Sequence, residues 1–171
     1  MTRETDASDR QLLRHTVATL AYRAEKVLRD APDDFPVWRL SPATRTPLDI
    51  VSHLGDLMEW AERISRGDAR WAPQPVDDWR AACDRFFVGL LALDATLAEV
   101  PLDAAATRAV FQGPVADALT HVGQLAMIRG IAGAPVRPES YARAEIQVGR
   151  VGREQSGVRR EFDGDASPRR P

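Results

Sequence analysis

Three histidines occur in the 171 residues, and two of them have neighbours whose types and spacing suit metal chemistry. His121 follows Asp117 by four residues and precedes Gln124 by three. Residues three or four apart share one face of a helix, so these side chains form a polar row. A carboxylate and an imidazole in such a row can hold one metal ion if another helix supplies a third ligand. His53 is the best-placed imidazole, because apolar residues one turn away on either side predict that it faces inward.

The same row also has a purely structural interpretation. Asp117 and His121 could pair at the solvated edge of an apolar stripe and contribute only a few tenths of a kcal/mol. A metal held by two histidines and one aspartate, in contrast, leaves coordination positions open for water or substrate, as a catalytic metal needs. Spacing alone leaves both interpretations open, because single histidines in helices are usually structural.

Other side chains offer weaker candidates for a site. His15 is expected between the buried and the exposed face of the first helix, and a role as a metal ligand is the less favoured interpretation. Asp56 could orient the imidazole of His53, and Arg129 could bind an anionic substrate, although an exposed carboxylate and a surface ion pair are the simpler interpretations. Cys83 has aromatic neighbours on its helix, which predicts a buried and unreactive thiol. The sequence shows no Ser–His–Asp or Cys–His arrangement and no glycine-rich phosphate loop.

Four amphipathic helices are expected to position these residues. Apolar residues recur every three or four positions in segments at about 8–29, 46–66, 77–99 and 113–132, separated by connections at 30–46, 66–76 and 100–113. Thr46 is the expected N-cap of the second helix, with Pro47 at its first position and Asp49 in its first turn. No segment alternates as a strand would, so the sequence predicts an all-α four-helix bundle.

The connections and the C-terminal region add to this prediction. The connection at 66–76 is long for antiparallel neighbours and favours a crossover along the bundle. Residues 1–148 would form the bundle, with one short covering element at 141–148. Residues 149–171 are rich in Arg, Gly and Asp, which predicts an extended or disordered tail.

Composition argues against several classes of function. The chain has 23 basic and 25 acidic residues and a net charge of −2, so neither nucleic acid nor an anionic membrane is an expected partner. A single cysteine excludes an internal disulfide and a multi-cysteine zinc site. Without a charged-then-apolar leader or an apolar run of about 18 residues, the expected location is the cytoplasm.

Two short motifs resemble those of the DinB/YfiT-like superfamily of bacterial four-helix proteins. They are Thr46-Pro-Leu-Asp-Ile-Val-Ser-His53-Leu and Asp117-Ala-Leu-Thr-His121-Val-Gly-Gln124-Leu. In that family, one metal ligand is a histidine on the second helix, and two more come from the last helix in a pattern like His-x-x-x-His-x-Gly-Gln. His53 matches the first ligand and His121 the third, whereas Asp117 stands where many relatives have histidine. We therefore expect His53, Asp117 and His121 to bind a divalent ion, zinc or nickel, with Gln124 beside them.

The resemblance covers about residues 8–148 and implies an up-down-down-up bundle and frequent homodimers. Characterised relatives include metal-dependent transferases and isomerases that use low-molecular-weight thiols such as mycothiol or bacillithiol. It thus implies a small-molecule substrate, a thiol as a candidate co-substrate, and a metal-dependent transferase or hydrolase as the reaction class. Whether the chain is an enzyme stays open, because no separate general base is evident. The alternative is a non-catalytic helical module that dimerises or binds a ligand, with a structural or vestigial metal site.

Overall fold

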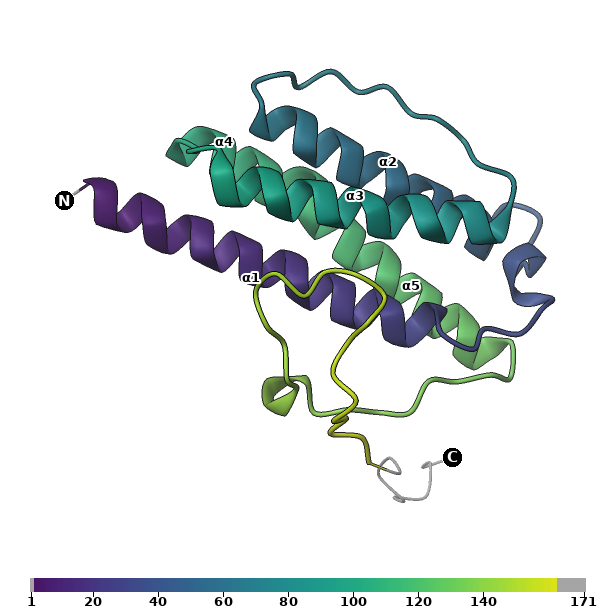
Figure 1. Ribbon diagram of the computed structural model, residues 1–171. Helices are drawn as coiled ribbons and strands as arrows, with labels where there is room; N and C mark the ends of the chain where they lie inside the picture. The colour runs from purple at the N-terminus through teal and green to yellow at the C-terminus, as the bar shows by residue number, and fades with distance from the viewer. Residues whose placement is uncertain (1, 163–171) are drawn as a thin grey trace.

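The computed structural model describes residues 2–162, with side chains from residue 7 onward, and its fold is all-α as the periodicity predicts (Figure 1). The helices are α1 (Thr2–Leu28), α2 (Pro47–Ser65), α3 (Trp79–Glu99), α4 (Ala104–Val110) and α5 (Ala116–Ile131). Shorter turns are the 3-10 turns η1 (Phe35–Val37) and η3 (Tyr141–Arg143) and the π-helical turn η2 (Phe111–Val115). Within the described part of the chain the only β-type pairing is an isolated antiparallel bridge between Glu139 and Glu161.

The start of α2 forms as its sequence predicts. Thr46 Oγ1 accepts a hydrogen bond of 3.0 Å from the backbone N–H of Asp49, and the Asp49 carboxylate accepts one of 2.9 Å from the N–H of Thr46. This reciprocal capping box satisfies two backbone donors that a helix start would otherwise leave unpaired. Gly67 follows the helix with a φ of +84°, a left-handed conformation that favours glycine.

The last helical rod of the bundle, which consists of α4, η2 and α5, begins at Ala104. The sequence analysis expects it to begin at residue 113, and that prediction is wrong. Asp103 caps α4 by accepting a hydrogen bond of 2.7 Å from Ala106 N–H, and α4, η2 and α5 then follow one another without a break. Gly113 and Pro114 do not begin a helix, because they lie within the π turn. A proline in a regular α-helix removes a hydrogen bond and clashes with the preceding turn, whereas a π turn already interrupts the α-helical ladder there.

The first helix is also longer than expected, since it begins at Thr2 rather than near residue 8. The first residues carry no apolar periodicity, which is why the pattern does not reveal them. Extending a helix that is already nucleated fixes one residue per added hydrogen bond, so polar residues can continue it without an apolar face.

Helices α2 and α3 lie side by side and run in the same direction. Arg85, near the start of α3, forms an ion pair of 2.7 Å with Asp56 in the middle of α2. Further along both helices, Arg66 at the end of α2 donates a hydrogen bond of 2.9 Å to Thr96 Oγ1 near the end of α3. Residue numbers therefore rise together along the two helices.

The connection from α2 to α3 returns along the length of α2 (Figure 1). Trp60 Nε1 donates a hydrogen bond of 2.9 Å to the carbonyl of Ala69. Seven residues later the N–H of Val76 donates one of 2.9 Å to Ser52 Oγ, two turns nearer the start of α2. Because the connection runs antiparallel to α2, it brings residues of the loop against the same helix that carries His53.

The core lies between the four rods. Its largest fully buried side chains come from α1, η1, α2, α3 and α5 and include Tyr22, Phe35, Leu54, Met58, Phe86, Leu90 and Leu125. Burial of each such apolar side chain contributes about 1.5–3 kcal/mol to the free energy of unfolding. Helices α2 and α3 pack closely at Gly89, where an added Cβ atom would lie 2.7 Å from Cβ of Met58.

After α5 the chain crosses back over α1 (Figure 1). Residues 149–162 of the predicted tail are non-helical and lie against the bundle, with Val151 buried and Arg159 paired with Glu25 at 2.6 Å. Residues 163–171 of that tail lie outside the described residues. The element expected at 141–148 is limited to the 3-10 turn Tyr141–Arg143. Among the described residues, no helix combines the length and the apolar character that a membrane span requires.

Candidate metal centre

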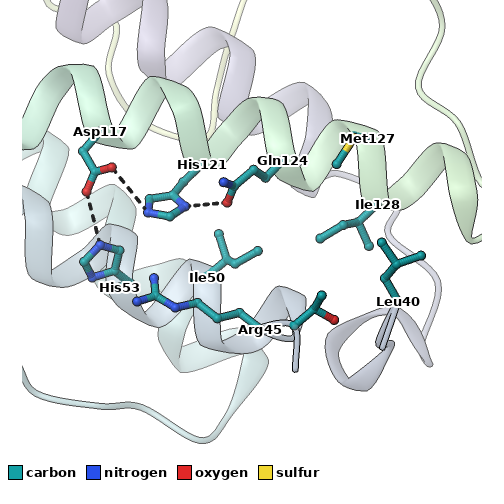
Figure 2. Close-up of a pocket in the computed structure, with 10 residues that line it drawn as sticks. Leu40, Arg45, Ile50, His53, Asp117, His121, Gln124, Met127 and Ile128 are labelled. Carbon is teal, nitrogen blue, oxygen red and sulfur yellow. Dashed lines mark hydrogen bonds and ion pairs between the residues drawn. The ribbon is translucent and has the colours of Figure 1, made fainter. Parts of the chain in front are cut away.

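The side chains of His53, Asp117 and His121 converge between α2 and α5 (Figure 2). His53 Nε2 lies 3.4 Å from Asp117 Oδ2, and His121 Nε2 lies 3.5 Å from Asp117 Oδ1. The two imidazole rings meet edge to face, with centroids 4.9 Å apart. One ligand atom from each residue can be chosen so that all three lie within 4.8 Å of one another. The structure thus brings together the three residues that the spacing and the resemblance single out.

The π turn η2 sets the direction in which Asp117 and His121 point. It ends at Val115, immediately before α5 begins at Ala116. A π turn holds one residue more than an α turn, so it rotates the following helix by about 100° about its axis. Helix α5 runs antiparallel to α2, because Gly113 lies beside Trp60 and Asp117 beside His53, nearer the start of α2. The polar row of α5 therefore faces His53. Wide turns of this kind inside helices frequently accompany functional sites.

The donor set suits a divalent ion of the zinc or nickel type. Tetrahedral zinc has bonds of about 2.0–2.2 Å to imidazole nitrogen and carboxylate oxygen, which places neighbouring ligand atoms about 3.3–3.6 Å apart. Each histidine nitrogen lies near this separation from one oxygen of Asp117, His53 at 3.4 Å from Oδ2 and His121 at 3.5 Å from Oδ1. Because the two contacts use different oxygens, and one atom from each residue lies within 4.8 Å of the others, binding of an ion through one oxygen requires the side chains to close in. Imidazole and carboxylate are also the ligand types that such ions accept. The residues present therefore fit a metal with three protein ligands.

Gln124 fixes the orientation of the His121 ring. Its Oε1 lies 2.7 Å from His121 Nδ1, and because an amide oxygen can only accept, the contact favours the tautomer in which Nδ1 carries the proton. With Nδ1 protonated, Nε2 carries the lone pair, and Nε2 is the nitrogen that faces Asp117. A hydrogen bond to the nitrogen that does not bind the metal is the usual way in which proteins orient a ligating histidine. Gln124 thus lies where such a supporting residue is needed.

The electrostatic surroundings favour neutral, metal-competent imidazole at His53. Partial burial is the main cause that lowers the pKa of His53 below its usual value, and the nearby His121 and Arg45 act in the same direction. The contact with Asp117 opposes this shift by favouring the protonated ring. A ring nitrogen must be free of its proton to bind a metal, so a lowered pKa makes His53 available near neutral pH.

A pocket of about 580 Å³ opens beside the three residues, and its lining includes Arg45, Ile50, Gln124 and Ile128. The edge of the site is covered by Trp71, whose ring meets that of His53 with centroids 5.8 Å apart and that of Trp60 at 5.4 Å. Sequence reasoning missed Arg45 and Trp71, because both belong to connections that carry no helical periodicity. The only hint of these two residues in the sequence is the length of the two connections, because a long connection has to run along or across the bundle.

The remaining candidates have structural surroundings. His15 is exposed on α1 and lines a different pocket, beside Tyr141. Asp56 is neither exposed nor in contact with His53, since it is buried and accepts hydrogen bonds from Arg85 and from the N–H of Gln74. The suggestion that Asp56 orients the imidazole is therefore wrong.

Arg129 is buried, so it neither forms a surface ion pair nor is exposed to bind an anionic substrate, and both expectations are wrong. Its guanidinium donates hydrogen bonds of 2.9 Å to the carbonyls of Val27 and Arg29, which terminate α1. Cys83 is buried as expected, and burial raises the pKa of its thiol to about 11, which leaves it protonated and unreactive at neutral pH.

Comparisons with protein-family models, with curated proteins and with solved structures gave no match to this chain. The interpretation of the site therefore depends on its own geometry and on the two motifs. The relationship to the DinB/YfiT-like superfamily stays a prediction.

Proposed function

We propose that this chain is a metal-binding protein of the DinB/YfiT type in which His53, Asp117 and His121 hold one divalent ion, zinc or nickel. The observation that carries the proposal is the convergence of three donor groups from two helices within 4.8 Å. The directions of the helices support it, because parallel α2 and α3 joined by a crossover are compatible with the up-down-down-up bundle that the resemblance implies.

The proposed chemistry is a transfer or hydrolysis reaction on a small molecule, with a low-molecular-weight thiol as a candidate co-substrate. When bound, a divalent ion of this type lowers the pKa of a coordinated water or thiol and so supplies a nucleophile near neutral pH. Asp117 contributes the negative charge that partly balances the ion, and Gln124 holds His121 in the required tautomer. The pocket beside the three residues gives a small molecule access to them.

Titration of zinc and nickel into chelator-treated protein without a His tag tests the metal site. We expect wild type to bind one ion per chain, and His121→Ala and Asp117→Ala to bind it at least tenfold more weakly. His15→Ala is the matched control, because it removes the histidine outside the cluster and should leave the affinity unchanged. Equal affinities in wild type and in both site variants would place the ion elsewhere and contradict the proposal.

Thiol-dependent turnover of electrophilic small molecules tests whether the site is catalytic. Turnover by the metal-loaded protein that is lost on chelation and in His121→Ala would support a metal-dependent transferase. Metal binding without turnover of any water- or thiol-dependent reaction would instead favour the non-catalytic module that the sequence left open.

We further propose a homodimer, as the resemblance implies. A groove lined by Leu12 and Phe111, two large apolar side chains that are about half to two-thirds exposed, offers apolar surface for such an association. Sedimentation that gave a strict monomer at micromolar concentration would contradict this part of the proposal.

A further inference from the structure

The pocket beside the candidate metal centre has a polar end and an apolar end (Figure 2). At the polar end lie the three predicted ligands, Gln124 and Ile50 line the middle, and the apolar end is lined by Leu40, Met127 and Ile128. Residues 117 and 128 of α5 mark the two ends. With a rise of 1.5 Å per residue, they place the ends about 16 Å apart along the helix. A ligand that fills this pocket therefore needs a polar head and an apolar tail.

Arg45 brings a positive charge into the polar end. Its side chain extends along the pocket, and its guanidinium lies beside the ring of His53 (Figure 2). Neighbouring residues hold its backbone in place, because Thr44 Oγ1 donates a hydrogen bond of 2.8 Å to the carbonyl of Ser41 and Thr46 caps α2. The position of Arg45 is thus fixed by a turn on one side and a helix start on the other.

The guanidinium of Arg45 is available to a ligand. Within the described part of the chain it forms no ion pair with a carboxylate and no side-chain hydrogen bond, whereas Arg39 in the same connection pairs with Asp49 at 3.8 Å. A guanidinium presents a planar fork of donors that matches a carboxylate and binds it with two parallel hydrogen bonds. Asp117 already faces the two histidines, and Arg45 lowers the pKa of Asp49 through space without an ion pair or hydrogen bond to it. The donors of the Arg45 guanidinium are therefore left for an anion that enters the pocket.

We infer that this pocket binds a carboxylic acid with an apolar tail, whose carboxylate pairs with Arg45 and whose tail lies against Leu40, Ile50 and Ile128. The inference rests on the proposed function in that it takes the same pocket as the substrate site. The carboxylate on Arg45 leaves the open coordination positions of the metal to another group of the substrate or to a co-substrate. Arg45 acts as a specificity-determining residue that selects acids over neutral analogues.

Binding of hexanoate and of its neutral analogue hexanamide, measured by calorimetry, tests the role of Arg45. We expect zinc-loaded wild type to bind hexanoate at least tenfold more tightly than hexanamide, and Arg45→Gln to lose this preference. Arg80→Gln is the matched control, since it removes the same charge from a side chain that is 91% exposed on α3 and should bind hexanoate as wild type does. Arg45 is itself exposed, so its replacement should not disturb folding.

The length of the acid tests the apolar end. Each buried CH₂ group should tighten binding about fourfold from acetate to hexanoate, until the tail reaches the end of the pocket. Leu40→Ala should weaken the binding of hexanoate several-fold and leave acetate almost unchanged. Because Leu40 is 55% exposed, this variant should keep the fold intact.

Equal binding of hexanoate by wild type and Arg45→Gln would overturn the inference, and so would equal binding of hexanoate and hexanamide by wild type. If the carboxylate of hexanoate coordinated zinc directly, wild type and Arg45→Gln would bind hexanoate equally, and this binding would be lost without zinc. The two proposals can fail separately. Arg45-dependent hexanoate binding by a protein that binds no zinc would refute only the metal site, whereas normal zinc affinity with no preference for acids would refute only this inference.

Discussion

In the proposed metal site, Gln124 is the residue that would hold His121 in the tautomer that binds the ion. Its amide oxygen accepts the Nδ1 proton at 2.7 Å, which leaves the lone pair of Nε2 directed toward Asp117. Leucine has a similar size but cannot accept that proton, so Gln124→Leu should release the ring and the tautomer. We expect zinc affinity to fall about 10- to 100-fold, measured by competition with a chelator of known affinity.

The exposed Gln11 on α1 provides the control for this prediction. Gln11→Leu makes the same chemical change outside the site and should bind zinc as wild type does. If Gln124→Leu also retained full affinity, the hydrogen bond to His121 would have no part in the metal site.

Individual residues of the site differ in how far the sequence predicts them. Asp117 and His121 could be predicted because their relationship is local: a spacing of four places them on one helix face whatever the rest of the fold does. Asp56 was misjudged because its partner Arg85 lies 29 residues away on another helix. Which residues of two helices lie side by side depends on how the helices pack, and the periodicity within one helix does not predict this. Arg45 escaped prediction for a similar reason, since the course of a connection depends on the elements that it joins.

At the scale of the elements, Arg85 joins α2, α3 and the crossover. It forms ion pairs of 2.7 Å with Asp56 and 2.8 Å with Glu59, and it donates a hydrogen bond of 2.8 Å to the carbonyl of Gln74. Asp56 is buried, so loss of Arg85 would leave its charge without its cationic partner. We expect Arg85→Met to lower the free energy of unfolding by about 3–5 kcal/mol, measured by urea denaturation.

Two further variants sharpen this prediction. Replacing Asp56 as well, in Arg85→Met with Asp56→Asn, should recover part of the loss, because no unpaired charge then remains buried. Arg80→Met on the exposed side of α3 should change stability by no more than about 0.5 kcal/mol. A loss in Arg80→Met as large as that in Arg85→Met would show that the ion pairs are not the cause.

The close contact of α2 and α3 gives a second prediction at this scale. An alanine Cβ at Gly89 would lie 2.7 Å from Cβ of Met58, so Gly89→Ala should force the helices apart and lower stability by about 1–3 kcal/mol. Gly130 on α5 has no such neighbour within 4 Å, and there alanine should stabilise the protein by up to about 1 kcal/mol through helix propensity. Opposite signs of the two effects in thermal denaturation would identify packing as the cause, and a stabilising Gly89→Ala would contradict it.

The rod of α4, η2 and α5 shows what periodicity can and cannot reveal. Its buried residues Val115, Ala118, Val122 and Leu125 follow the helical steps of three and four, and this part was predicted. Val110, Pro114 and Val115 are also buried, and Val110 and Val115 are five residues apart on either side of the widened turn. A spacing of five is typical of a π turn. It shifts the apolar positions of α4 relative to those of α5, so a single helical periodicity does not join the two helices. The same feature that hid α4 orients Asp117 toward His53.

At the scale of the whole molecule, the segment after α5 is fastened to α1 through buried charges. Glu139 accepts hydrogen bonds of 2.5 Å from Tyr22 and 2.6 Å from Lys26, and Lys26 also pairs with Glu161 at 2.8 Å. Lys26 is the only lysine of the chain, and its side chain is 2% exposed. Ion pairs as well as apolar contacts thus hold this segment against the bundle. The composition of the segment does not predict these ion pairs, because the partners lie more than 100 residues apart in the sequence.

Acid should weaken this attachment, and Glu139 shows why. Burial opposes the ionisation of Glu139, but the hydrogen bonds from Lys26 and Tyr22 outweigh it and lower the pKa of the carboxyl below its usual value of about 4.5. A carboxyl whose pKa is lower in the folded than in the unfolded state contributes stability above the unfolded value. That contribution is lost as the pH falls through the lowered folded pKa. We therefore expect the free energy of unfolding to decrease below about pH 4.5, measured by urea denaturation between pH 3 and pH 7.

The variant Glu139→Gln separates this carboxyl from all others that titrate in acid. At pH 7 it should lower the free energy of unfolding by about 2–4 kcal/mol, because Lys26 loses one of its two buried partners. Toward pH 3 the difference from wild type should shrink, since protonation removes the same charge from Glu139 itself. Glu154→Gln, on an exposed part of the same segment, should follow the wild-type curve throughout. A constant difference between Glu139→Gln and wild type at every pH would show that the ionised carboxylate does not fasten the segment to α1.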